Sequence, residues 1–364
     1  MNKDLTVGKP SQVLWQFCLP MFGSIIFQQL YNIADSLVAG KFIGENALAA
    51  VGNSYEITLI FIAFAFGCNI GCSVIVSRYF GAKDWESLEK AIHTTVALGL
   101  AAGAVLTVVG VILTPQILHW MGTPEDVIGN SVAYFRTYFL GSIAVVMYNV
   151  GASILQSVGN SRSPMKYLIT ASLINIVLDL LFIGVLGYGV AAAAFATIIS
   201  QSVSAILAFS KLMRSKEAWA VSWRKVRFDG PMLHGVILQG LPSGIQNSVI
   251  SLANVIVQAN INSFGALAMA GCGSYSKVEG FAFLPVTCFS MALATFVSQN
   301  VGAGKPDRVH KGMRFGVICS ITLAECVGVA VYLLAPWLIG AFSSEADVVA
   351  FGAVSYTHLR AHET

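Results

Sequence analysis

Charge is scarce in this sequence. Asp, Glu, Lys and Arg together make up 11% of its 364 residues, whereas a soluble domain carries about 25%. Apolar residues make up 56% and form long runs, among them residues 96–113 and 198–210. Because a helix needs about 20 mostly apolar residues to cross a bilayer, the chain has room for roughly nine or ten spanning helices. The composition therefore predicts an integral membrane protein and excludes a soluble enzyme, a nucleic-acid-binding domain and a disulfide scaffold.

Signatures of nucleotide-driven or enzymatic chemistry are also missing. The segment Gly302-Ala303-Gly304-Lys305 resembles a phosphate loop only superficially, because it lacks the Walker spacing and follows a predicted membrane helix. No His–Glu metal motif and no Ser–Lys pairing falls in the predicted spans. We therefore expect no enzymatic activity and no cofactor, and we expect any pumping to draw on an ion gradient. Residues 1–11 lead into the first apolar run without a small-residue cleavage site, so we expect that span to be retained.

Ten apolar segments follow one another along the chain. They lie near residues 12–38, 54–77, 91–114, 127–153, 165–185, 189–211, 234–260, 274–299 and 315–341, and the tenth begins near residue 347. Counted along the sequence, 17 of the 21 Lys and Arg residues fall at the N-terminus and in every second connection. The positive-inside rule places those connections and the N-terminus in the cytoplasm. The pattern predicts a multi-pass membrane protein.

The two halves of the chain repeat each other. Leu19-Pro20 corresponds to Leu241-Pro242, and Gly81-Ala82 corresponds to Gly302-Ala303, at offsets of 222 and 221 residues. Because this offset covers six helices, an even number, the repeats have the same orientation in the membrane. Parallel repeats place their substrate in the cleft between the halves.

The repeat predicts the domain organisation. We expect an all-α polytopic membrane protein of two parallel-repeat six-helix lobes, with the second lobe incomplete. The expected parts are an N-lobe with helices 1–6 (1–211), a basic cytoplasmic linker (212–233), a partial C-lobe (234–354) and a polar, non-native tail (355–364). The alternative for the tail is a real truncated product with a polar end.

Carboxylates inside predicted spans point to function, because each costs about 2.5–3.5 kcal/mol at a helix centre. Asp35 shares one polar face with Gln28 and Asn32, and Pro20 in the same segment permits a bend. We interpret this segment as a moving part that carries an ion site. The alternative is that Asp35 lies near the outer helix end, since Lys41 follows closely.

Asp179 lies well inside the fifth span, and Asn175 precedes it by one helical turn. Burial disfavours the charged form of a carboxylate, which suits a proton carrier. With Asp35 and amide oxygens nearby, Asp179 can instead bind Na⁺, which prefers hard oxygen ligands. The alternative is a hydrogen-bonded Asp that only packs.

The seventh span, the counterpart of the first, carries a polar stripe without an acid. Its members are Asn247, Ser251, Asn254 and Gln258. We predict ion coupling in the first half and a substrate-lined cleft from this stripe together with Gln28 and Asn32. The alternative is hydrogen bonding between neighbouring helices. Glu325 in the ninth span is either a second acidic site or a buried, protonated residue.

Motifs from both halves resemble the multidrug and toxic compound extrusion (MATE) family, and within it the bacterial branch related to the DNA-damage-inducible F protein. The residues that carry the resemblance are Leu19-Pro20, Asn32 to Asp35, Gly81-Ala82-Lys83, Leu155 to Asn160 with Pro164, Asn175 to Asp179, Leu241-Pro242 and Gln299 to Gly304.

The resemblance implies twelve helices in two lobes that alternate access, with a cation site in the first lobe. The residues it assigns to that site are Asp35, Tyr134, Asn149, Asn175, Asp179 and Thr197, with bending at Pro20 on protonation. It also implies H⁺ or Na⁺ as the coupling ion and a bacterial inner membrane location.

The expected function is export of amphipathic, often cationic drugs. The expected partners are a small-molecule substrate and membrane lipid, with no nucleic acid and no obligate protein partner. The alternatives are a lipid-linked oligosaccharide flippase of the same fold superfamily, against which the scarcity of Lys and Arg in the spans argues, and a nonfunctional fragment.

Overall fold

A computed structural model describes residues 4–42, 67, 69–120, 125–263 and 283–340, and within them all the regular secondary structure is helical. The α-helices are α1 (Pro10–Phe42), α3 (Trp85–Trp120), α4 (Glu125–Leu140), α5 (Ser142–Ser157), α6 (Arg162–Asp179), α7 (Ala191–Met213), α8 (Gly230–Ser263), α10 (Leu284–Gly302) and α11 (Pro306–Gly340). Residues 69–82 are also helical. Among the described residues, six helices are long and apolar enough to cross a membrane, or seven if a bent pair counts as one span. The predictions for most of the second span, the tenth span and the tail fall outside the described residues.

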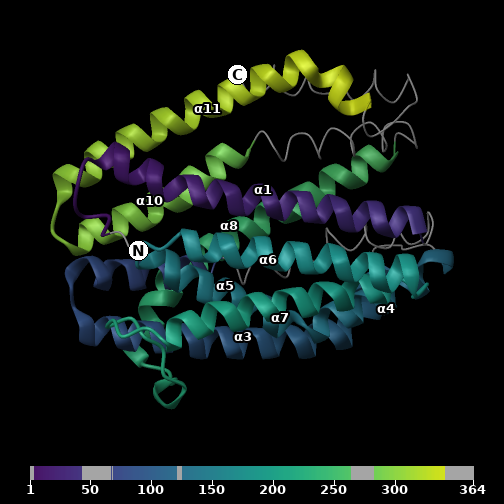
Figure 1. The fold of residues 1–364 in the computed structure, drawn as a ribbon, viewed down its shortest axis with the longest axis horizontal. Helices are drawn as coiled ribbons and strands as arrows, with labels where there is room; N and C mark the ends of the chain where they lie inside the picture. The colour runs from purple at the N-terminus through teal and green to yellow at the C-terminus, as the bar shows by residue number, and fades with distance from the viewer. Residues whose placement is uncertain (1–3, 43–66, 68, 121–124, 264–282, 341–364) are drawn as a thin grey trace.

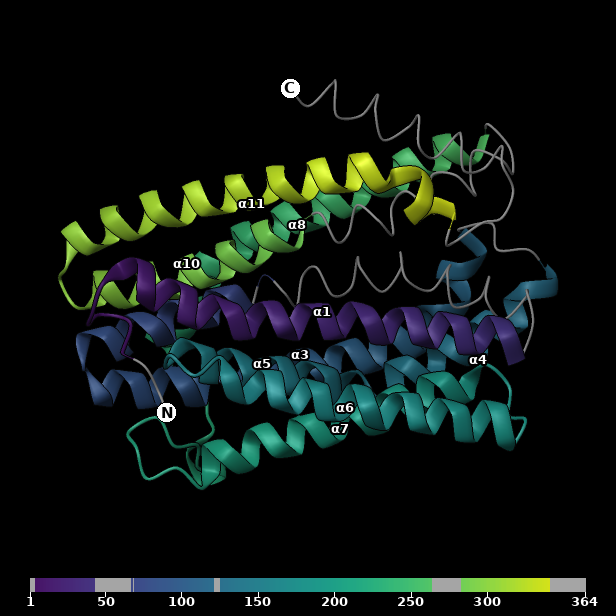
Figure 2. The same ribbon diagram turned by 45° about the horizontal axis from the view of Figure 1, so that its top comes forward.

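The helices form two groups with α1 between them (Figures 1 and 2). Helices α3 to α7, the first-half helices, lie on one side, and α10 and α11 lie on the other. Helix α8, which with α10 and α11 makes up the second-half helices, contacts α3. Helix α1 contacts α6 in the first half and both α10 and α11 in the second. One helix therefore bridges the two halves.

The part of α1 near its start packs in a core shared with α10. Phe17, Cys18 and Met21 are buried together with Phe289 and Phe296. The short π-helix η1 (Leu180–Val185), which follows α6, also contacts α1. Both halves thus hold α1 by packing, and α1 contains Pro20.

The segment predicted as one span over 127–153 is two helices bent by 47° at Gly141. A Cβ atom on Gly141 would lie 2.1 Å from Cγ1 of Ile198 in α7. The missing side chain therefore lets α7 pack directly against the break. Sequence periodicity could not show this bend, because its cause is a neighbour far away in the chain.

The two halves cross at one end of the molecule (left in Figure 1). We call it the basic end because Lys83 and Lys305 lie in its connections, Lys90 lies in the early part of α3 and Lys211 in the last turn of α7. A Cβ atom on Gly81 would lie 1.9 Å from the carbonyl oxygen of Gln299, and one on Gly302 would lie 1.9 Å from that of Arg78. Each glycine thus packs on the backbone three residues before the other. The predicted repeat positions are in mutual contact.

The basic connection after α7 is folded onto α3 rather than extended. The backbone N–H of Ser222 donates to His93 Nε2 at 3.0 Å, and Lys225 pairs with Glu89. Trp223, which starts the 3₁₀ helix η2 (Trp223–Lys225), stacks on Phe209 at 5.5 Å between ring centroids. These contacts fix the connection against the start of α3 and the end of α7.

The start of α3 is capped by an acid at the same end. The N–H of Ser87 donates to Asp84 Oδ1 at 3.1 Å. Hydrogen bonds from the Ser87 side chain and backbone lower the pKa of Asp84 below its ordinary value. An ionised carboxylate at a helix N-terminus satisfies free N–H groups there.

Candidate functional site

Helix α6 places two of the predicted site residues on one buried face. Asn175 and Asp179 are each 1% exposed, and Ala171 and Leu168 continue the same face toward the start of the helix. The predicted sharing of a face by Asn175 and Asp179 is confirmed by the geometry. An acid so completely removed from solvent lies in the interior of the first half, not on its lipid-facing surface.

Asp179 is the residue at which α6 ends and η1 begins. In η1 the N–H of Leu186 bonds the carbonyl of Leu181, five residues earlier, at 2.9 Å. A π-turn inserts one residue and so rotates everything that follows it, and such turns are frequent at functional sites. The sequence predicted a regular helix across this point, and the π-turn is a difference from that prediction.

Thr197 on α7 joins Asn175. The Thr197 hydroxyl donates to the carbonyl of Ala193 at 3.1 Å, which leaves its lone pairs to accept from Asn175 Nδ2 at 3.4 Å. Thr197 is 7% exposed. The pair is therefore a buried polar contact between α6 and α7.

The side-chain oxygen of Asn175 accepts no hydrogen bond from the described residues. This atom, Oδ1, is fully buried. A buried acceptor without a partner costs about 1–3 kcal/mol. Beside a carboxylate, such an oxygen is suited to accept from a proton carrier or to ligate a hard cation.

Tyr134 on α4 borders the same region. It is half-buried and packs against Ile183 of η1 and Ala193 of α7. Its ring stacks on that of Tyr138 at 6.4 Å. The structure therefore brings Tyr134 to the wall formed by the residues around Asp179 and Thr197.

Asn149 is placed differently. Its Nδ2 donates to the carbonyl of Val145 in its own helix, α5, at 2.8 Å. Its backbone carbonyl oxygen accepts from Asn69 Nδ2 at 3.4 Å. The described bonds of Asn149 thus connect it to helical residues 69–82 rather than to Asn175.

Helix α1 runs beside this site through its contacts with α6 and η1. Asn32 and Asp35 lie on α1, but their side chains fall outside the described part of the structure. Pro20 is buried, and the Ser24 hydroxyl donates to its carbonyl at 3.0 Å. Gln28 is exposed.

The second-half stripe is confirmed only as a set of positions on α8. Asn247 is half-buried and donates to the carbonyl of Ser243 in its own helix at 2.9 Å. Ser251 is half-buried and Asn254 exposed, while the side chain of Gln258 is outside the described part. Glu325 is exposed on α11, so of its two alternatives the buried, protonated residue does not hold.

Gln201 is a polar residue of this site that the sequence reasoning missed. It lies on α7 one turn beyond Thr197, and its side chain is 6% exposed. Its Oε1 is buried without a hydrogen-bond partner. The spacing of Thr197, Gln201 and Ser204 on one helical face was the signal that could have found it.

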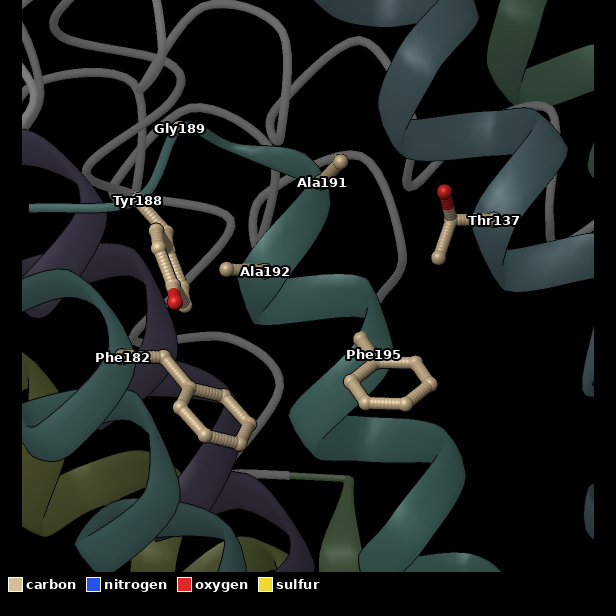
Figure 3. Close-up of a pocket in the computed structure, with 7 residues that line it drawn as sticks. All are labelled: Thr137, Phe182, Tyr188, Gly189, Ala191, Ala192 and Phe195. Atoms are coloured by element: carbon tan, nitrogen blue, oxygen red, sulfur yellow. The ribbon is translucent and has the colours of Figure 1, made fainter. Parts of the chain in front are cut away.

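A pocket of about 450 Å³ opens at the seam of α4, η1 and α7 (Figure 3). The rings of Phe182, Tyr188 and Phe195 point into it. Thr137 lines it from α4, and its hydroxyl donates to the carbonyl of Ala133 in the same helix at 2.8 Å. Its other lining residues are Gly189, Ala191 and Ala192. With no ionisable group but a phenol, this lining suits an apolar group rather than an ion.

The chain belongs to the MATE family. The family's MatE sequence profile matches residues 20–181 and 242–360, one segment in each half. The protein is accordingly a polytopic membrane transporter and not an enzyme.

Individual relatives agree with this assignment. The chain is 27% identical to the probable multidrug resistance protein YoeA of Bacillus subtilis, over 94% of this chain and 76% of the relative. It is 29% identical to the probable multidrug resistance protein YpnP of the same organism, over 96% and 78%. It is 25% identical to an FAD transporter of Shewanella oneidensis, over 93% and 75%.

Solved structures match the fold along nearly the whole chain. A multidrug resistance MATE family transporter in an outward-facing conformation superposes with a TM-score of 0.90 at 23% identity, over 97% of this chain and 79% of that one. A MOP superfamily transporter from Pyrococcus furiosus gives 0.90 at 24% identity, over 98% and 79%.

Proposed function

We propose that this protein is a cation-coupled antiporter that exports amphipathic, often cationic compounds across a bacterial inner membrane. The observation that carries the proposal is the buried cluster of Asp179, Asn175 and Thr197 between α6 and α7. Relatives named as multidrug resistance proteins support the substrate class. The motifs favour the bacterial branch related to the DNA-damage-inducible F protein.

The proposed orientation follows from the basic end. Lys and Arg in connections mark the cytoplasmic side, so we place the basic end and the N-terminus in the cytoplasm. The lobes are residues 1–211 and 234–354, joined by the linker 212–233. In the structure the halves meet at the basic end through Gly81 and Gly302, and this corresponds to a state closed toward the cytoplasm.

The residues act by linkage between ion and substrate. H⁺ or Na⁺ entering from outside binds at Asp179, with Asn175 Oδ1 as a second oxygen and Asp35 on α1 as the second carboxylate. Thr197 fixes the Asn175 amide so that its oxygen faces the ion. Ion binding draws α1 toward α6 and disfavours the substrate-bound state, so the substrate leaves outside. Each charge moving down 100 mV supplies about 2.3 kcal/mol.

Ethidium accumulation in cells that lack their own drug pumps tests the proposal. The protein as it stands should lower accumulation, and Asp179→Asn should abolish the effect, because the neutral amide cannot exchange a proton or balance a cation. Glu217→Gln is the matched control, since Glu217 is exposed in the linker. A protonophore and replacement of Na⁺ by K⁺ separate the two ions. Undiminished export by Asp179→Asn would contradict the site, and no export by any variant would favour a narrower substrate or a flippase.

A further inference from the structure

A short segment precedes α1 and forms a tight turn. We call residues 4–9 the N-terminal strap. The Asp4 carboxylate accepts from the N–H and the hydroxyl of Thr6, at 2.8 and 2.6 Å. Leu5 is completely buried and belongs to the core that contains Phe17, Phe289 and Phe296. The strap is therefore built into the protein, although it lies at its edge.

The backbone of Leu5 is bonded on both sides by α10. Its N–H donates to Gln299 Oε1 at 3.1 Å, and its carbonyl accepts from Asn300 Nδ2 at 3.3 Å. Gln299 and Asn300 are themselves completely buried. The two side chains therefore satisfy both backbone polar groups of Leu5, which burial has removed from water.

Two cations after α10 complete the attachment. Lys305 Nζ donates to the carbonyl of Thr6 at 2.9 Å. Arg308 donates to the carbonyls of Leu5 and Gly8 at 3.1 and 2.5 Å, and its Nε donates to Asn300 Oδ1 at 2.9 Å. Both cationic side chains thus donate charge-assisted hydrogen bonds to backbone carbonyls of the strap. Such bonds are stronger than hydrogen bonds between neutral groups.

Gln299 also reaches the first half. Its Nε2 donates to the carbonyl of Ser157, the last residue of α5, at 2.6 Å. Its own carbonyl is the atom against which Gly81 packs. One buried side chain thus holds the strap, the second half and the first half together at the point where the halves cross.

From these contacts we propose that the N-terminal strap is a latch that keeps the basic end closed. The strap continues directly into α1, which both halves hold by packing. Separation of the halves at the basic end breaks the Gln299–Ser157 bond and pulls α1 from one of its partners. Release of the strap frees the start of α1 to follow the first half, so the latch links bending at Pro20 to opening. This inference rests on the proposed alternating access.

Chemical labelling at position 157 tests whether the basic end is closed, and it needs no transported substrate. Ser157 is completely buried. Its hydroxyl bonds that of Ser73 within the first half at 3.0 Å, and its carbonyl accepts from Gln299 of the second half at 2.6 Å. We therefore expect the thiol of Ser157→Cys to react faster with a membrane-impermeant maleimide when the basic end opens and the bond to Gln299 breaks. Vesicles that expose this end are labelled, and the modification of the peptide containing position 157 is followed by mass spectrometry. Because ethidium is absent, failure of the latch and failure of the drug-export proposal give separate results.

The latch variant is Lys305→Ala with Arg308→Ala. It should raise the labelling rate at position 157 about tenfold, which corresponds to about 1.4 kcal/mol in the closing equilibrium. Lys311→Ala with Arg314→Ala removes the same charge from exposed positions of α11 and should leave the rate unchanged. Gly81→Ala prevents the close contact between the halves, so its labelling rate at position 157 serves as the reference for a protein with the basic end open.

Each outcome decides the question. Faster labelling with the latch variant alone supports the latch. Labelling at the original rate, while Gly81→Ala labels fast, overturns it. Equal acceleration by the Lys311 and Arg314 changes also overturns it, because the effect is then one of charge. Monodisperse elution of the latch variant, whose two residues are not fully buried, shows that the fold is retained.

Discussion

Asn175 donates a hydrogen bond from Nδ2 to Thr197 Oγ1 at 3.4 Å, and the Thr197 hydroxyl donates its own hydrogen bond to the carbonyl of Ala193. This chain of two bonds fixes the direction of the amide. It leaves Asn175 Oδ1, and not the amide nitrogen, as the group without a partner. An oxygen so presented next to Asp179 suits a cation or an acidic proton.

Thr197→Val should weaken ion coupling. Valine fills the same volume but cannot accept from Asn175, so the amide loses its orientation and its nitrogen is left without a partner, at about 1–3 kcal/mol. We expect ion-driven ethidium efflux from loaded vesicles to fall about tenfold, as 1.4 kcal/mol implies. Thr197→Ser should retain efflux. Thr170→Val, on the exposed face of α6, is the control, and an equal loss there would contradict the assignment.

Gln201→Leu should separate function from stability. If Gln201 only packs, replacing a buried amide whose oxygen has no partner should raise thermal stability and leave efflux intact. We expect higher stability but weaker dependence of efflux on the ion gradient, because the site loses an oxygen. Gln246→Leu, exposed on α8, serves as the comparison. Unchanged ion dependence in purified, reconstituted protein would remove Gln201 from the site.

The sequence allowed a good prediction of what depends on local pattern. Composition and apolar runs predicted the membrane helices, and the spacing of Asn175 and Asp179 predicted their common face. Neither feature needs knowledge of distant residues. For Gly81 and Gly302, the repeat predicted that the two positions are equivalent, but it did not predict that they are in contact.

What the sequence could not predict depends on neighbours in space. The contact between Gly81 and Gly302 joins two segments that lie far apart in the sequence. The bend at Gly141 needs Ile198 of α7 against it, and the attachment of Leu5 needs Gln299, 294 residues away. The π-turn after Asp179 cannot be recognised in the sequence, because the apolar residues 180–183 would fit an α-helix equally well.

Pro20→Ala should stabilise α1 and impair transport. Proline inside a helix removes one backbone hydrogen bond and costs about 3 kcal/mol, so alanine should raise the melting temperature while opposing the bend. We expect efflux to fall although the protein is more stable. Pro115→Ala in α3 makes the same chemical change in a helix to which we assign no movement. Full efflux by Pro20→Ala would show that the bend is not needed.

Gly81→Ala and Gly302→Ala should each hold the basic end open. The new methyl group would lie 1.9 Å from a backbone carbonyl oxygen of the other half, and backbone cannot move aside as a side chain can. Efflux should therefore be lost and Ser157→Cys should label rapidly. Gly129→Ala in α4, where no atom lies within 4 Å, should change neither.

The double variant of Gly81 and Gly302 adds a test of the crossing itself. Both substitutions oppose one and the same contact, so their effects on the labelling rate should not add. A second methyl group cannot open a contact that the first has already broken. Multiplied effects would mean that each glycine acts on a separate equilibrium, and the crossing would then not open as one unit.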